Sequence, residues 1–264
     1  MKQVQHIASA QNERLKQLAK WLRHSRNRRE CGVAVLEGIH LAKSFSSRQY
    51  VMEQVFIPEH RLQQTEVTAW LAESPIREQY IVSDNALSKI SSLSDADDVI
   101  CVIRLLESGT LPQTQDCVVL ESVQDPGNVG TLLRSAAAAG VQHIVLSRDC
   151  ADVWSPKVLR AGMGAHALLT LHTDTDLQHW VQQYRAARYA TVLNEHAASL
   201  YTLSLREPCA WLFGNEGSGL STELQQYTDK TVFIPMQIGV ESLNVAMAAT
   251  VCLFEQQRQR LALG

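Results

Sequence analysis

The chain has 264 residues, 45% of them hydrophobic and 19% charged, which is enough apolar material for one large or two small domains. A net charge of −3 argues against a bulk nucleic-acid binder, and no stretch approaches the roughly eighteen apolar residues of a membrane-spanning helix. The opening MKQVQHIASAQNERLK lacks the apolar core of a signal peptide, so we expect a cytoplasmic protein with no membrane partner.

The six cysteines predict no metal site. None of them forms a C-x-x-C pair, and most stand in apolar, strand-like runs. We therefore expect buried free thiols of a reducing compartment and no zinc. The six are Cys31, Cys101, Cys117, Cys150, Cys209 and Cys252.

The first thirty residues are basic. They hold eight Lys or Arg against Glu13 and Glu30, a net charge of +6, whereas the remainder of the chain carries −9. A basic segment on an otherwise acidic chain indicates contact with a polyanion such as RNA. The alternative is an amphipathic helix whose charged face is simply solvated.

Residues 33–106 alternate strand and helix signals, which indicates a small α/β unit. With the basic segment it forms a predicted domain, 1–106. Residues 107–115, ESGTLPQTQ, have no apolar period and predict a linker. Strands are predicted at 33–36, 51–58, 79–84 and 98–106, with helical segments after Gly38, around 65–72 and from Asp84.

Residues 116–264 repeat the alternation with longer pieces, which predicts a mostly parallel sheet with helices on its faces. DPGN, 125–128, is turn chemistry, and a helix is predicted over 131–140 with Gly140 as its cap. The predicted strands are 117–123, 143–147, 189–194, 209–214 and 231–236. A final helix, 242–258, has a predicted apolar face of Leu243, Ala246, Met247, Thr250, Val251 and Phe254.

Three segments at predicted strand ends combine small residues with polar side chains: 124–136, the loop FGNEGSGLS at 213–221, and 234–249. Ligands of open α/β sheets bind at such ends. Each segment also has a simpler explanation. Asn128 could belong to a turn, Arg134 could be a surface arginine on the second turn of its helix, and Glu216 could be an exposed loop acid. Ser242 and Asn244 could only cap a helix.

Taken together, the three segments resemble a known family. Asn128, Gly130 and Arg134 stand in N-x-G-x-x-x-R order, residues 213–220 read FGNEGSGL, and IPM at 234–236 is followed by SLN at 242–244. This combination resembles the SpoU-type (TrmH-like) RNA 2′-O-ribose methyltransferases of the SPOUT superfamily over about residues 116–258. SPKVLRAGMGA, starting at Ser155, is also similar to a helix of that family.

A weaker resemblance concerns the first domain. VLEGIHLAKS at 35–44 is similar to the ribosomal-protein-like (L30e-type) substrate-binding domain that often precedes the methyltransferase. The resemblance as a whole implies structured RNA as substrate, with ribosomal RNA slightly ahead of transfer RNA. It also implies a homodimer in which the knotted regions pack on each other near Arg134.

For the catalytic domain, the resemblance implies a deep trefoil knot whose loops surround the adenosine of S-adenosylmethionine. The residues implied for cofactor binding, largely through main-chain groups, are Gly214, Ile234, Met236 and Leu243. Those implied for catalysis are Arg134, Asn128, Glu216, Ser242 and Asn244. Arg134 would grip a phosphate and hold the ribose hydroxyl in line, because a guanidinium stays protonated and is a poor base. Glu216 and Asn128 would orient it, and Ser242 and Asn244 would bond near the methyl acceptor.

Two alternatives remain at this level. A non-catalytic RNA-binding module could keep the knotted fold, although such a protein would be expected to lose the Arg, Glu or Asn of the motifs. A nucleotide-dependent oxidoreductase is disfavoured, because no G-x-G-x-x-G opens a helix after a strand.

Overall fold

The computed structural model describes residues 4–91, 98–192 and 197–262, which form two compact units. The first unit consists of Met1–Glu107 and Trp154–Ala167, and the second of Ser108–Val153 and Leu168–Gly264. Lys2 of the basic segment and the last two residues of the predicted strand 189–194 lie outside the described residues. No helix in the described ranges has the length and hydropathy needed to span a bilayer.

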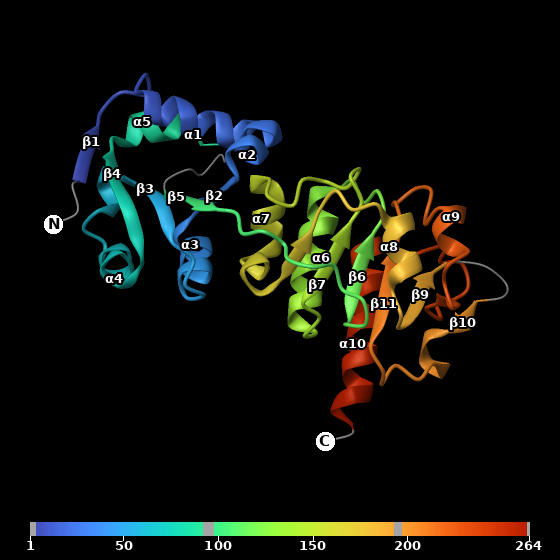
Figure 1. The fold of residues 1–264 in the computed structure, drawn as a ribbon. Helices are drawn as coiled ribbons and strands as arrows, with labels where there is room; N and C mark the ends of the chain where they lie inside the picture. Colours follow the sequence, from blue (N-terminus) through green and yellow to red (C-terminus); the bar gives the residue numbers. More distant parts are fainter. Residues whose placement is uncertain (1–3, 92–97, 193–196, 263–264) are drawn as a thin grey trace. The chain divides into compact units, whose positions relative to one another are not determined.

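The first unit is a mixed five-stranded sheet in the order β1-β4-β3-β5-β2 (Figure 1). β5 runs antiparallel to β2 and β3, while β1, β4 and β3 are parallel to one another. The strands are β1 Val4–Ile7, β2 Val33–Glu37, β3 Met52–Pro58, β4 Ile76–Val82 and β5 Ile100–Arg104. The helices are α1 Glu13–Arg23, α2 Ser25–Cys31, α3 Ile39–Ser46, η1 Glu59–Arg61, α4 Thr65–Glu73, α5 Asp84–Ser88 and α7 Pro156–Gly162.

Side chains of this sheet alternate between two apolar clusters, as the period of a strand requires. On β3, Val55 and Ile57 pack into a cluster that includes α3, α4 and α7, whereas Phe56 packs into the cluster that includes α1. Both clusters consist almost entirely of buried aliphatic and aromatic side chains. The short strand signals of residues 33–106 therefore mark a sheet covered on both faces.

One arginine of the basic segment does not face solvent. Arg28 is only 4% exposed, and its guanidinium donates to the carbonyls of Trp21 and Leu22 at the end of α1. Burial of an arginine is stable when its donors are satisfied in this way. The expectation that the whole segment is a solvated or RNA-facing surface is thus wrong at Arg28, whereas Lys20 and Arg23 are exposed.

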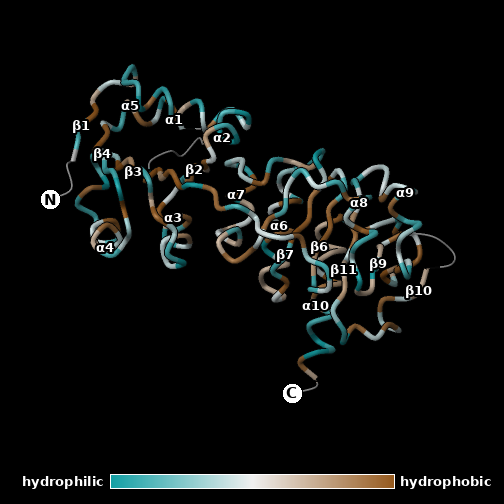
Figure 2. Tube along the Cα trace, viewed as in Figure 1, coloured by the Kyte–Doolittle hydropathy of each residue, from teal (hydrophilic) through white to brown (hydrophobic). Residues whose placement is uncertain are grey.

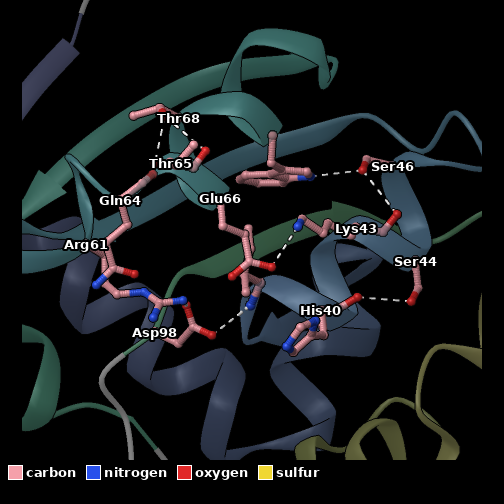
Figure 3. Close-up of polar contacts among 12 residues, drawn as sticks. His40, Lys43, Ser44, Ser46, Arg61, Gln64, Thr65, Glu66, Thr68 and Asp98 are labelled. Carbon is pink, nitrogen blue, oxygen red and sulfur yellow. Dashed lines mark hydrogen bonds and ion pairs between the residues drawn. The ribbon is translucent and has the colours of Figure 1, made fainter.

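Helices α3 and α4 are held together by polar contacts (Figure 3). Lys43 donates to Glu66 at 2.7 Å, and the indole Nε1 of Trp70 donates to Ser46 Oγ at 2.9 Å. Each donor has an acceptor on the facing helix. These side chains therefore fix the packing of the two helices.

A third contact stabilises the start of α3. Asp98 accepts from the backbone N of Ile39 at 2.9 Å, and its other oxygen pairs with Arg61 at 2.9 Å (Figure 3). A carboxylate at this position satisfies an N–H that has no partner within the helix. The Arg61–Asp98 pair thus serves the local fold of the first unit.

The second unit is a seven-stranded sheet, parallel throughout, in the order β10-β12-β9-β11-β6-β7-β8. This confirms the expected α/β class with a mostly parallel sheet. The strands are β6 Cys117–Leu120, β7 His143–Leu146, β8 Thr170–His172, β9 Ala187–Thr191, β10 Ala198–Ser199, β11 Cys209–Phe213 and β12 Lys230–Phe233. The helices are α6 Pro126–Ala138, η2 Ala165–Leu168 (in the first unit up to Ala167), α8 Leu177–Gln183, η3 Leu200–Thr202, α9 Thr222–Gln225 and α10 Val245–Leu261.

Figure 2 shows hydrophobic colour along the central strands β6 and β11 and hydrophilic colour on the last turns of α10. Those turns are nevertheless anchored. Trp211 on β11 donates its indole N–H to Gln256 at 2.7 Å, and Arg260 pairs with Asp116 at 2.6 Å. The end of α10 is therefore bound to the sheet by polar contacts rather than by an apolar face.

α6 and α10 lie side by side and run in the same direction. Asn128 contacts Asn244, Ser135 bonds Thr250 at 2.7 Å, and further along both helices Gln257 donates to the carbonyl of Ala138. The predicted apolar face of the last helix is wrong in part. The residues that face the interior are Ala246, Ala249, Cys252, Leu253 and Gln256, whereas Leu243, Met247 and Phe254 are exposed.

Of the six cysteines, all in the thiol form, four are buried and Cys150 is partly buried, but Cys31, at the end of α2, is exposed. The expectation of buried thiols therefore fails at Cys31.

Candidate active site

Loops from four parallel strands meet at one edge of the second sheet. Because β6, β9, β11 and β12 run in the same direction, their carboxyl ends share that edge. A cavity of about 610 Å³ lies there. It is lined by Thr191 and Val192 at the end of β9, by residues 214–220 and Gln225 after β11, by residues 232–234 and Met236 at the end of β12, and by residues 241–245 and Ala248 around the start of α10.

The glycine loop after β11 folds back on itself. The backbones of Asn215 and Gly219 exchange two hydrogen bonds, of 3.0 and 2.9 Å, and Gly219 has a positive φ of 71°. A Cβ on Gly214 would lie 2.2 Å from the backbone of Gly219 and Leu220. No side chain fits at that distance, so glycine at 214 is a steric requirement of the loop.

The segment DPGN is the start of α6, not a turn that precedes a helix at 131. Asp125 is the N-cap and accepts from the backbone N of Asn128 at 2.8 Å, and Pro126 occupies the first helical position. Proline is favoured there because its missing N–H would have no helical partner. Asn128 thus lies in the first turn of α6. Arg134, six residues later, lies in the third turn, one turn further from the helix start than a helix beginning at 131 would place it.

Three of the candidate residues form one hydrogen-bonded chain. Asn128 Nδ2 donates to Glu216 Oε1 at 2.9 Å, and Asn128 Oδ1 accepts from Asn244 Nδ2 at 2.8 Å. Asn244 Oδ1 in turn accepts from the backbone N of Ala246 at 2.9 Å. The ionised carboxylate of Glu216 can only accept a hydrogen bond, and the backbone N–H of Ala246 can only donate one. These two partners therefore determine which way the side-chain amides of Asn128 and Asn244 are oriented.

Glu216 is held as a carboxylate. Partial burial acts to raise its pKa, but the hydrogen bonds from Asn128 and from backbone N–H groups outweigh burial and lower the pKa below the usual value. The backbone groups include those of Gln124 and Asp125. The glycine loop and the start of α6 are therefore joined through one charged group.

The remaining candidates are placed differently. Ser242 and Leu243 line the cavity and are exposed. Ile234 and Met236 line it and are partly buried, and Gly214 lines it and is buried. Arg134 is exposed on α6 and, within the described ranges, forms no hydrogen bond or ion pair. The structure thus brings together Asn128, Glu216 and Asn244, but it does not join Arg134 to them.

Comparison with known proteins decides the family. The model of the SpoU rRNA Methylase family matches residues 116–254, more than half of the chain. The chain belongs to the SpoU rRNA methylase family. The resemblance inferred from the three motifs is thereby confirmed. A second model, the MRM3-like substrate binding domain, matches residues 12–101 and confirms a substrate-binding domain ahead of the SpoU domain.

Relatives extend over nearly the whole chain. An uncharacterized tRNA/rRNA methyltransferase of Synechocystis sp. is 32% identical over 98% of this chain and 96% of its own. The 23S rRNA (guanosine(2553)-2′-O)-methyltransferase RlmP of Bacillus subtilis is 28% identical over 95% and 98%. A crystal structure of an AdoMet-bound rRNA methyltransferase from Sinorhizobium meliloti is 25% identical, covers 97% of this chain and 98% of that one, and superposes with a TM-score of 0.82.

Sequence reasoning missed several parts of this SpoU site. Thr191 and Val192 line the cavity, and Asp125 and Asn215 shape the loops around it. Their position directly after a strand, or before a proline, is the signal that could have identified them. Among the described residues, no group of His, Cys, Asp and Glu is arranged to hold a metal ion.

Proposed function

We propose that this protein transfers a methyl group from S-adenosylmethionine to the 2′-hydroxyl of a ribose in ribosomal RNA. Membership of the SpoU family and likeness to RlmP over 95% of the chain support this reaction. The single observation that carries it is the chain Glu216–Asn128–Asn244 at the edge of the cavity formed by the glycine loop. The protein acts in the cytoplasm, in keeping with its bacterial rRNA-modifying relatives.

The cavity fits the cofactor. A volume of about 610 Å³ lies within the range of pockets for small molecules, roughly 300–1,000 Å³. Gly214 lets the loop close tightly against Gly219 and Leu220 and form one wall of the cavity. The apolar side chains of Ile234, Met236 and Leu243 suit a flat adenine ring. These four residues are the proposed cofactor-binding residues.

The chemistry assigned to the chain is alignment. The sulfonium of the cofactor supplies an activated methyl group, whereas a ribose hydroxyl is a weak nucleophile until it is oriented and its proton polarised. Asn128 is locked between Glu216 and Asn244, and it keeps one N–H and one lone pair free of those two bonds. We assign Asn128, Asn244 and Ser242 to positioning the acceptor ribose, and Glu216 to holding the loop.

Arg134 is assigned to the RNA backbone. Its exposure and its lack of a protein partner in the described structure are what a guanidinium needs in order to grip a phosphate with two parallel hydrogen bonds. A phosphate held in this way would fix the adjacent ribose. The position of Arg134 on α6, well removed from Asn128, favours contact with RNA rather than with the Glu216 network.

The first unit supplies RNA affinity. We assign residues 1–106 to substrate binding, 107–115 to a linker and 116–264 to the methyltransferase domain, a division supported by the ranges of the two family matches. Within 116–264, the segment Trp154–Ala167 belongs to the first compact unit of the structure. Exposed cations of α1 such as Lys20 and Arg23 would contact phosphates, which releases counterions and makes binding dependent on salt.

The protein acts as a homodimer. Met247 and Phe254 are 48% and 42% exposed and, seven residues apart, lie on one side of α10, while Leu243, 38% exposed, directly precedes the N-cap Asn244. α10 packs beside α6, the helix that carries Arg134. A stripe of this kind on a soluble protein is typically covered by a partner, and a second copy related by a two-fold axis is the simplest one. Sedimentation should give a dimer, and Met247→Glu should convert it to the 29.4 kDa monomer. A wild-type monomer with full activity would contradict the assignment.

The decisive experiment is to map ribose methylation in total RNA from cells with and without the gene. One 2′-O-methyl site in ribosomal RNA should disappear, and the purified protein with S-adenosylmethionine should restore it in vitro. Loss of a 2′-O-methyl site in transfer RNA would instead identify transfer RNA as the substrate. An unchanged map, with RNA binding intact, would favour the non-catalytic module.

A further inference from the structure

Glu121 connects two loops of the second unit. It follows β6 directly and is partly buried. Its Oε1 accepts from Ser221 Oγ at 2.6 Å, and its Oε2 accepts from the backbone N of Ser221 at 2.7 Å. Both oxygens of one carboxylate therefore hold a single residue that lies 100 positions further along the chain.

The same residue also contacts the other end of the glycine loop. The backbone N of Glu121 donates to the carbonyl of Phe213 at 2.9 Å, where β11 ends and the loop begins. Ser221 stands where the loop ends and caps α9 by accepting from the backbone N of Leu224. Residues 214–220 are thus fixed at both ends by Glu121, at the start through its main chain and at the end through its side chain.

The loop so enclosed forms one wall of the cavity. All of residues 214–220 line it, and the tight approach at Gly214 leaves the loop little freedom to adjust. Two further contacts come from the segment that follows Glu121. Asn215 Nδ2 donates to the carbonyl of Ser122 at 2.9 Å, and the backbone N of Asp125 donates to Glu216 Oε1 at 3.2 Å. At the other end of the loop, the carbonyl of Leu220 also accepts from Gln225 Nε2 at 2.6 Å. Loss of the Glu121 contact would therefore leave that end held by fewer bonds than its start.

We propose that Glu121 is a positioning residue for S-adenosylmethionine, acting through Ser221 to hold the glycine loop in its binding conformation. The inference rests on the proposed cofactor. Bonds to an ionised carboxylate are roughly twice as strong as bonds between neutral groups, which suits a contact that must hold a loop against a ligand. Because Glu121 lies outside the lining of the cavity, its loss should weaken cofactor binding more than it slows methyl transfer once the cofactor is bound.

The test compares five forms of the full-length protein by calorimetry with S-adenosylmethionine and by methyl transfer at saturating cofactor. These are the wild type, Glu121→Ala, Ser221→Ala, the double variant, and Glu121→Gln. Glu121→Ala should raise the Kd at least tenfold, which is about 1.4 kcal/mol, with a change in kcat of less than about threefold. The double variant should be little worse than Glu121→Ala, since both changes remove the same contact.

Glu121→Gln should recover most of the affinity. Its amide oxygen can accept from the backbone N of Ser221, and its amide nitrogen can donate to Ser221 Oγ. The matched control is Glu223→Gln on α9, an exposed acid outside the cavity lining, and its Kd should be unchanged. Circular dichroism melts check the fold of each variant. If Glu121→Ala does not fold, Ser221→Ala and Glu121→Gln decide the question.

An unchanged Kd in a folded Glu121→Ala or Ser221→Ala variant would overturn the role of Glu121. Additive effects in the double variant would do the same, because the two residues would then act separately. A wild-type protein that does not bind S-adenosylmethionine would instead refute the proposed function. The two failures are therefore distinguishable.

Discussion

The two units are built from the same alternation of strands and helices, but they use their polar side chains differently. In the first unit β5 runs against its neighbours, so the carboxyl ends of the strands are divided between two edges of the sheet. In the second unit all described strands are parallel, and their carboxyl ends share one edge. Only the second arrangement brings loops from several strands to a single place.

The cavities of the two units illustrate the consequence. One of about 590 Å³ lies between α3 and α4, and one of about 610 Å³ lies at the strand ends of the second unit. In the former, Lys43 pairs with Glu66 and Trp70 with Ser46, so these contacts hold two neighbouring helices together (Figure 3). In the latter, Asn128 joins loops from distant parts of the chain. Convergence of polar groups, rather than volume, identifies the site.

The strongest test of this contrast is Arg134→Ala. Methyl transfer should fall by about 10²–10⁴-fold in a single-turnover assay, because both phosphate binding and alignment of the hydroxyl are lost. Cofactor affinity should stay constant, and Arg134→Lys should not rescue, since an ammonium lacks the planar fork. Arg206→Ala, another exposed arginine of the same unit, is the control. A drop of less than tenfold would remove Arg134 from the site.

Gly214→Ala should abolish detectable cofactor binding or weaken it by roughly 100-fold, because the new Cβ would lie 2.2 Å from backbone atoms that cannot move independently. Gly217→Ala is the matched control in the same loop. Its Cβ would meet only the side-chain oxygen of Asn215, at 3.5 Å. Calorimetry measures both, and equal affinities would show that the loop is not a rigid wall.

Arg28→Ala tests the first unit, in which a charged side chain stabilises the fold. It should destabilise the first unit by about 2–3 kcal/mol, because the carbonyls of Trp21 and Leu22 lose a charged donor. Hydrogen exchange should rise in peptides of the first unit and not in those of the second. Lys20→Ala and Arg23→Ala should instead leave exchange unchanged and flatten the salt dependence of RNA binding. Faster exchange in both units would mean that the units are coupled.

The smallest expected effect concerns pH. Burial, together with neighbouring His143, lowers the pKa of His172 to about 4, so the folded state holds this ring neutral. The unfolded chain binds the proton near pH 6.5, so stability is lost as the pH falls from about 6.5 towards 4. In chemical denaturation, His172→Phe should reduce the dependence of the unfolding free energy on pH between about 6.5 and 4. An unchanged dependence would mean that other groups cause it.

Much of the site could be predicted from the sequence because its residues stand at strand ends in recognisable order. The start of α6 could not, since the proline and glycine of DPGN mark turns as well as first helical turns, and only the bond from Asn128 N to Asp125 distinguishes them. The face of α10 that packs against the sheet could not be predicted from the sequence either. Its apolar residues form two stripes, and periodicity cannot tell which stripe faces the sheet. Burial of Arg28 depends on carbonyls that no charge count reveals.

The bond between Asn128 and Asn244 has a consequence for synthesis of the protein. It joins residues that are 116 positions apart. At a translation rate of about 5–20 residues per second, roughly 6–23 s pass between the emergence of the first partner and that of the second. Residues 4–107 of the first unit precede both partners in the chain, and its remaining segment, Trp154–Ala167, is complete well before Asn244 appears. A nascent chain can thus hold a folded substrate-binding unit while the Glu216–Asn128–Asn244 chain is still incomplete, so the cofactor site can form only after Asn244 has been synthesised.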